Sequence, residues 1–264
     1  MFTPTIDKMA VCAALALALL GSHVSAQAAE FVPPLGALSP ENLNKPRPKP
    51  PFNLTGTWFV RLGGGYTFTF GPPYPKFKPE AQKAYDESQR ARKENRPYRD
   101  DSGLCYPIGM PMLMTRVWPI AMIQMPTAIY MVSGFNNGFR VIYLDGRKHT
   151  DPDIVVRTYN GDSIGHWEGD TLVVDSISFE TERHWIDSGL PVSEQFRMIE
   201  RIRMVEGGKE LEIKYILTDP VNWEGEWTSV KRWRRVDDQD ITEVECTPSL
   251  NEHLPSTRHL NEQR

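Results

Sequence analysis

The chain has 264 residues, of which 40% are hydrophobic and 24% charged, and its formal net charge is −4. The small negative charge excludes a protein that binds nucleic acid through its phosphates, and the apolar fraction excludes a disordered chain. The 22 prolines follow no Gly-X-Y repeat, which excludes a collagen-like protein.

The N-terminus has the pattern of an export signal. Lys8 precedes an apolar run, Met9 to Gly21, which is shorter than the roughly 20 residues of a membrane span. Small residues then offer cleavage sites after Ala26 or Ala28. We interpret residues 1–28 as a signal peptide and expect a periplasmic protein with no membrane span. An uncleaved anchor is the alternative.

The next segment is rich in proline. Between Glu30 and Pro51 there are seven prolines, and such a chain is extended and forms neither a helix nor a central strand. We therefore expect residues 29–53 to be a plain tether. A β-barrel domain at 54–250 and a polar tail at 251–264 are expected to follow.

Most of the remaining chain has the pattern of short strands. One helix is predicted from Pro79 to Asn95, with proline in its first turn and few apolar residues, which is typical of a surface helix. Strands are predicted over 55–62, 66–70, 120–125, 128–133, 139–144, 153–159, 163–167, 170–179, 195–205, 210–218, 227–236 and 241–246. Turn signals such as Glu168-Gly169 and Gly207-Gly208 separate several of them. This spacing predicts an all-β fold, an antiparallel meander closed as a barrel or folded as a sandwich.

Two cysteines, Cys105 and Cys246, follow the signal. An even number in an oxidising compartment suggests a disulfide, and two buried thiols are the alternative. The chain has no C-x-x-C and no H-E-x-x-H motif, so we predict no metal site and no cofactor.

The alternation of strand side chains singles out two carboxylates. Glu200 interrupts the apolar even positions of 196–204, and Asp175 interrupts the largely apolar odd positions of 171–179. Burial raises the pKa of an unpaired carboxyl group, which prepares it to act as a general acid or base. The alternative is a salt bridge from each carboxylate to an arginine.

Histidines and aromatic residues supply further candidates. His149 and His184 are acid–base candidates, and surface or hydrogen-bonded structural histidines are the alternative. Methionines and aromatic residues are concentrated between residues 106 and 143, either as core or as the wall of a barrel that holds a small apolar molecule. The candidate ligand contacts are Arg116 and Arg140, as anchors for a carboxylate or phenolate, and Tyr130, Tyr143 and Trp167, as the apolar wall.

Two patterns resemble known families. Gly56-Thr57-Trp58 is similar to the G-x-W motif in the first strand of lipocalin-like (calycin) barrels, which implies a lipocalin-like antiparallel barrel. The segments Cys105–Pro111, Tyr143–His149 and Ser163–Asp175 resemble a large family of exported, mostly uncharacterised bacterial proteins. A few of these are associated with cofactor-free lyases that remove a carboxyl or hydroxymethyl carbon from lignin-derived phenylcoumarans.

Two functional hypotheses follow. The first is a periplasmic, cofactor-independent lyase, of decarboxylase or formaldehyde-lyase type, that acts on a small hydrophobic, lignin-derived aromatic compound. Its acid–base groups would come from Glu200, Asp175, His149 and His184. The alternative is a periplasmic carrier that binds a hydrophobic ligand without changing it. Carboxylates held in arginine pairs away from any cavity would contradict the lyase hypothesis.

Overall fold

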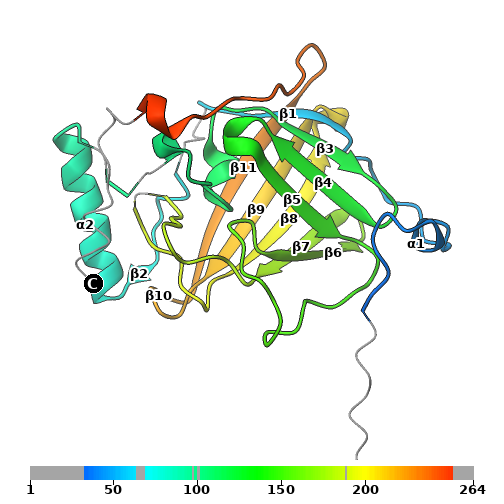
Figure 1. The fold of residues 1–264 in the computed structure, drawn as a ribbon, viewed down its shortest axis with the longest axis horizontal. Helices are drawn as coiled ribbons and strands as arrows, with labels where there is room; N and C mark the ends of the chain where they lie inside the picture. Colours follow the sequence, from blue (N-terminus) through cyan, green and yellow to red (C-terminus); the bar gives the residue numbers. More distant parts are fainter. Residues whose placement is uncertain (1–32, 64–68, 97, 100–101, 188, 252–264) are drawn as a thin grey trace, which may run out of the picture. The chain divides into compact units, whose positions relative to one another are not determined.

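Nine strands form a closed barrel within the described residues (Figure 1). The computed structural model describes residues 33–63, 69–96, 98–99, 102–187 and 189–251. The barrel strands are β1 (Gly56–Val60), β3 (Ile120–Gln124), β4 (Ala128–Ser133), β5 (Gly138–Tyr143), β6 (Asp162–Glu168), β7 (Thr171–Ile177), β8 (Arg197–Val205), β9 (Glu210–Thr218) and β11 (Glu226–Val236). Their order is β1-β11-β9-β8-β7-β6-β5-β4-β3, and β3 pairs with β1 to close the barrel. The predicted closed β-barrel is confirmed, although one pair of neighbouring strands is parallel and not antiparallel as expected.

Several sequence predictions fall outside the described residues. The signal peptide, nearly all of the polar tail, and most of the strand predicted over 66–70 lie there. Strand β1 pairs with β11 on one side and with β3 on the other. Among the described residues, no helix is long and apolar enough to cross a membrane.

One pair of neighbouring barrel strands is parallel. β5 and β6 are joined by only two residue pairs, Ile142 with Ser163 and Tyr143 with Ile164. Parallel neighbours need a crossover connection. Residues 144–161 form this crossover between β5 and β6. The strand predicted over 153–159 is therefore wrong. Val156 is 81% exposed, and Thr158 makes only an isolated bridge to Phe179. Residues 241–246 are likewise not a strand.

The barrel core follows the alternation of side chains along the strands. On β9, Leu211, Ile213, Tyr215 and Leu217 point inward and are completely buried. The indoles of β1 and β11 (Trp58, Trp227 and Trp233) are also buried. The interior is thus filled largely by apolar and aromatic side chains.

The two α-helices, α1 and α2, lie on opposite sides of the barrel (Figure 1). Helix α2 (Pro79–Lys93) buries a narrow face of small residues, Ala81, Ala84, Ser88 and Ala91, which confirms the predicted surface helix. The short strands β2 (Lys76–Phe77) and β10 (Trp223–Glu224) pair beside it. Among the described residues, the remaining helical segments are α1 (Pro40–Leu43) and five 3₁₀ turns, η1 (Ser102–Leu104), η2 (Met112–Thr115), η3 (Phe135–Asn137), η4 (Glu206–Gly208) and η5 (Pro248–Asn251).

Residues 34–53, here called the strap, pack against the barrel end opposite α2. The hydroxyl of Thr127 donates to the carbonyl of Ala37 at 2.6 Å, and the amide of Asn42 donates to Asp145 Oδ2 at 2.9 Å. Ala37 and Asn42 are buried. The expectation of a plain, helix-free tether was wrong. Pro40 opens the short helix α1, where proline is tolerated because the first N–H has no partner within the helix.

A disulfide joins Cys105 to Cys246, 141 positions apart. The predicted bond is confirmed, and the alternative of two buried thiols was wrong. The bond ties the segment after β11 to the turn that follows η1.

Removal of this disulfide should destabilise the fold strongly, because the bond restricts a very long loop in the unfolded chain. The double variant Cys105→Ser/Cys246→Ser is expected to lose roughly 4–5 kcal/mol in the chain-entropy model. Denaturant unfolding of oxidised wild type, reduced wild type and the variant measures this loss. Reduced wild type should match the variant, and equal midpoints for all three proteins would contradict the expectation.

Candidate functional site

A buried polar cluster spans the inner face of the barrel at the β5–β6 seam. The guanidinium of Arg140, on β5, contacts Glu200 on β8 with both Nη atoms, with Nη1 3.2 Å from Oε1. It also donates to Ser163 Oγ on β6 at 3.2 Å and to Ser176 Oγ on β7 at 2.9 Å. The two serine hydroxyls are 2.8 Å apart. Four adjacent strands are thus joined through one guanidinium.

Glu200 does lie on the inner face that strand alternation predicts. Its side chain and that of Arg140 are each only 1% exposed. The arginine alternative therefore holds, and Glu200 is half of a buried ion pair. Arg140 is not available as an anchor for a ligand carboxylate, because its guanidinium already binds Glu200 and two serines.

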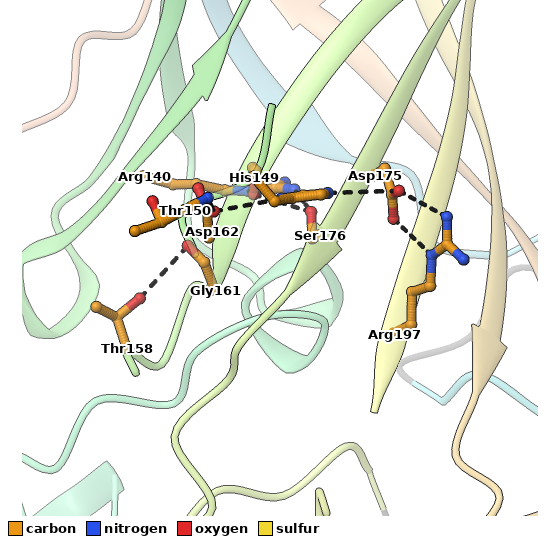
Figure 2. Close-up of polar contacts among 10 residues, drawn as sticks. Arg140, His149, Thr150, Thr158, Gly161, Asp162, Asp175, Ser176 and Arg197 are labelled. Carbon is orange, nitrogen blue, oxygen red and sulfur yellow. Dashed lines mark hydrogen bonds and ion pairs between the residues drawn. The ribbon is translucent and has the colours of Figure 1, made fainter. Parts of the chain in front are cut away.

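A second cluster lies on the outer face of the same strands (Figure 2). The ring of His149, from the crossover, lies between two carboxylates, with Nδ1 3.3 Å from Asp162 Oδ2 and Nε2 3.4 Å from Asp175 Oδ2. Arg197, at the start of β8, donates to both oxygens of Asp175 at 2.8 and 2.7 Å. The backbone N–H of Thr150 donates to Asp162 at 2.7 Å.

These contacts decide the protonation states of the outer cluster. Hydrogen bonds to Asp162 and then Asp175 raise the pKa of His149 to about 9. Burial alone would raise the pKa of Asp175, but the bonds from His149 and Arg197 outweigh it and hold that pKa well below its ordinary value. At neutral pH the histidine is charged and cannot accept a proton, and the carboxylate has none to give.

Asp175 is on the outer face of β7, not among the inward side chains that the sequence predicted. It lies opposite Ile164 and Ile199, whereas the inward positions carry Leu172, Val174 and Ser176. The prediction of a raised carboxyl pKa at Asp175 was wrong because its charge is paired. Most of β7 is buried on both faces, so its sequence alternation does not reveal which face is inside.

His184 belongs to a separate part of the core. Its Nδ1 is 2.8 Å from the carbonyl oxygen of Glu180, and its ring packs against Tyr159 and Phe179. Burial lowers the pKa of His184 to about 4, so the ring is neutral at pH 7. The structure does not bring it together with His149, Asp175 or Glu200.

The predicted ligand contacts are also dispersed. Tyr130 and Tyr143 lie on the outer face, where Tyr130 stacks on Phe139 and Tyr143 lies 3.9 Å beneath the Arg147 guanidinium. The prediction that they line the lumen was wrong, because their positions on β4 and β5 point outward. Arg116 lines a cavity of about 410 Å³ near α2. Trp167 alone lies at the larger cleft described next.

An open cleft of about 1060 Å³, the strap cleft, lies between the strap and the barrel end. It is lined by strap residues between Leu43 and Asn53 and by barrel residues 124–126, 144–146, 165–167 and 169. Its aromatic wall is Phe52 and Trp167, whose rings meet edge to face with centroids 4.8 Å apart. The cleft forms where β6 continues past the last residue that pairs with β5.

Sequence reasoning missed several residues of these sites. Asp162 follows the turn signal Asn160-Gly161, and Phe52 stands in a segment interpreted as a tether. The four acid–base candidates, Glu200, Asp175, His149 and His184, do not line the strap cleft. Among the described residues, no group of three or more His, Cys, Asp and Glu side chains is placed to hold a metal ion.

The fold and the site define a closed β-barrel with a mainly apolar cleft at one end. No family model matches the chain, and no curated protein matches it. Among solved structures it is similar to the wild-type fluorescent protein UnaG, with 12% identity over 69% of this chain and 96% of that chain, at a TM-score of 0.32. It is also similar to the REP1-NXSQ fatty acid transporter, with 11% identity over 70% of this chain and 98% of that chain, at a TM-score of 0.30.

The buried Arg140–Glu200 pair should be costly to break at one partner. Glu200→Gln leaves the guanidinium uncompensated in the core, and we expect a loss of about 3–5 kcal/mol in unfolding free energy. The double variant Arg140→Met/Glu200→Met should lose less, because both charges are removed. As a control, Glu224→Gln breaks the exposed pair with Lys76 and should cost below about 1 kcal/mol. Similar losses for Glu200→Gln and Glu224→Gln would contradict a buried pair.

The His149 cluster should make stability depend on pH. The folded-state pKa of His149 is raised from 6.5 to about 9, so its contribution is complete below about pH 6.5 and disappears as the pH rises through about 9. The difference in unfolding free energy between wild type and His149→Gln should therefore shrink over that interval. Unfolding in urea at a series of pH values measures it. A difference that grows with pH would contradict the assignment.

Proposed function

We propose that the protein binds a small hydrophobic molecule in the strap cleft and releases it chemically unchanged. The observation that carries this proposal is the cleft itself, with a volume of about 1060 Å³ and a mainly apolar lining. Ligand sites in proteins are typically concave, largely apolar and of roughly 300–1,000 Å³. A cleft of this size accommodates a molecule with one or several rings.

The lining favours a flat apolar guest. Phe52 and Trp167 form an aromatic wall, and Met125 and Leu144 add flexible and branched apolar surface. Aromatic rings pack well in offset or edge-to-face geometry against such a wall, and methionine adapts to irregular shapes. An aromatic ligand is therefore the class that the site fits best.

The chemistry required of a lyase has less support. Ring opening with loss of a carbon needs an acid and a base within hydrogen-bond reach of the ligand. Glu200 and Asp175 are held in arginine pairs, and His149 is protonated between two carboxylates. None of these groups lines the cleft, and the carboxylate and the histidine that do, Asp145 and His166, are paired with Arg147 and Glu168. The carrier hypothesis is therefore favoured over the lyase. The periplasm is the proposed location, based on the export pattern of residues 1–28.

Binding is tested with a neutral aromatic fluorescent probe, N-phenylnaphthylamine, and purified mature protein. Trp167→Ala and Phe52→Ala should each weaken binding by about fivefold, because each variant loses a ring contact worth roughly 1 kcal/mol. Phe139→Ala is the matched control, since this ring is exposed on the outer face away from the cleft. Equal losses in all three variants, or no binding to wild type, would contradict the proposal.

The fate of the ligand separates a carrier from a lyase. Carboxylated and hydroxymethylated lignin-derived aromatic dimers are incubated with the protein and extracted, and their molecular masses are measured by mass spectrometry. A carrier returns each dimer with its mass unchanged. Catalytic loss of carbon dioxide or formaldehyde would overturn the carrier assignment and restore the lyase.

A further inference from the structure

We propose that the strap cleft selects anionic ligands, with Lys45 and Lys49 binding the carboxylate of a molecule whose aromatic body packs on Phe52 and Trp167. This inference rests on the proposed function, because it names the class of ligand for the same cleft. Its basis is the distribution of charge around the lining.

The strap brings three cations to a protein whose overall charge is negative. Lys45, Arg47 and Lys49 all line the cleft, although the chain carries a net charge of −4. Arg47 donates to neutral oxygens, the carbonyls of Asn42 and Lys45 and the Asn42 side-chain amide, at 2.5–3.1 Å. Its positive charge is therefore held in place by the strap without a carboxylate partner in these contacts.

The two lysines are better placed than Arg47 to meet a ligand. Both are exposed, and neither forms an ion pair with the residues that the structure describes. A lysine ammonium is a compact point charge on a flexible stem, so both can turn toward an anionic group at the mouth of the cleft.

Negative charge at the cleft is already neutralised. Of the lining residues, only Asp145 is acidic. It accepts hydrogen bonds from Arg147 Nε and Nη2 at 2.8 and 2.6 Å and from Asn42 at 2.9 Å. Although burial opposes the change, these bonds lower the pKa of Asp145 to about 2. The Asp145–Arg147 pair is neutral overall, so the strap cations determine the sign of the site.

The order of residues in the strap suits this role. Lys45, Arg47 and Lys49 alternate with Pro46, Pro48 and Pro50. Proline fixes φ, which limits the conformational freedom that neighbouring residues lose on binding. The contacts of Asn42 and Ala37 with the barrel hold the other end of the strap. A positive, partly rigid rim beside an aromatic wall fits a ligand with a carboxylate and an aromatic body.

The test compares two probes of nearly equal shape, naphthoate and naphthamide, on the full mature protein by calorimetry. Wild type should bind naphthoate more tightly. The double variant Lys45→Gln/Lys49→Gln should lower naphthoate affinity by roughly three- to tenfold, since each exposed charge contributes modestly, and should leave naphthamide affinity unchanged. Added salt should reduce the naphthoate preference in wild type only.

A matched control removes the same charge elsewhere. Lys209→Gln/Lys214→Gln changes two exposed lysines at the β9 side of the barrel and should leave both affinities unchanged. If the control lowers naphthoate affinity as much as the strap variant, the role of the strap is overturned. Equal affinities of wild type for both probes overturn the anion preference and leave the proposed function intact. Binding of neither probe overturns the proposed function itself.

Discussion

Closure of the barrel depends on the parallel seam between β5 and β6, where the backbone ladder has only two residue pairs. On the inner face, a side-chain network compensates for this short ladder. Arg140 joins β5 to β6, β7 and β8 from the inside, while His149 joins Asp162 on β6 to Asp175 on β7 from the outside. Polar groups in a core are tolerated when they satisfy one another. The inner cluster crosses the seam, and the outer cluster joins the crossover to β6 and β7. This structural demand explains why unusual carboxylates stand in these strands without forming an acid–base site.

The same seam creates the strap cleft. β6 runs on to Glu168, beyond its last residue paired with β5, and the chain leaves β5 through Leu144 and the Asp145-Gly146 turn. Gly165 faces this departing chain, where an added Cβ would lie 2.9 Å from Leu144 Cδ2, so the absence of a side chain permits the close approach. Asp145 then fixes the strap through Asn42. The short ladder, the turn and the strap are therefore parts of one arrangement, and the cleft is its consequence.

Sequence patterns predicted what depends on local alternation and missed what depends on long-range contacts. Eight of the barrel strands beyond β1 follow apolar or alternating runs, and Glu200 was found because β8 has a clear inner face. Asp175 was misplaced because β7 is largely buried on both faces, so its alternation does not distinguish the inner face from the outer one. The apolar run at 153–159 has the composition of a strand, but it lies within the crossover. The strap has the composition of a tether, and its attachment depends on Thr127 and Asp145, which are far away in sequence.

The position of the cleft also bears on how a ligand would be exchanged. The lumen is occupied by large side chains such as Trp58, Trp227 and Tyr215, and the Arg140–Glu200 pair holds the strands around them. A ligand in the lumen would have to displace tightly packed core groups, which is costly in a protein interior. A ligand in the strap cleft meets an existing surface, so it can enter and leave while the barrel stays closed. The proposed reversible binding fits this arrangement, because the barrel holds Trp167 in place while the strap supplies Phe52 and the cations.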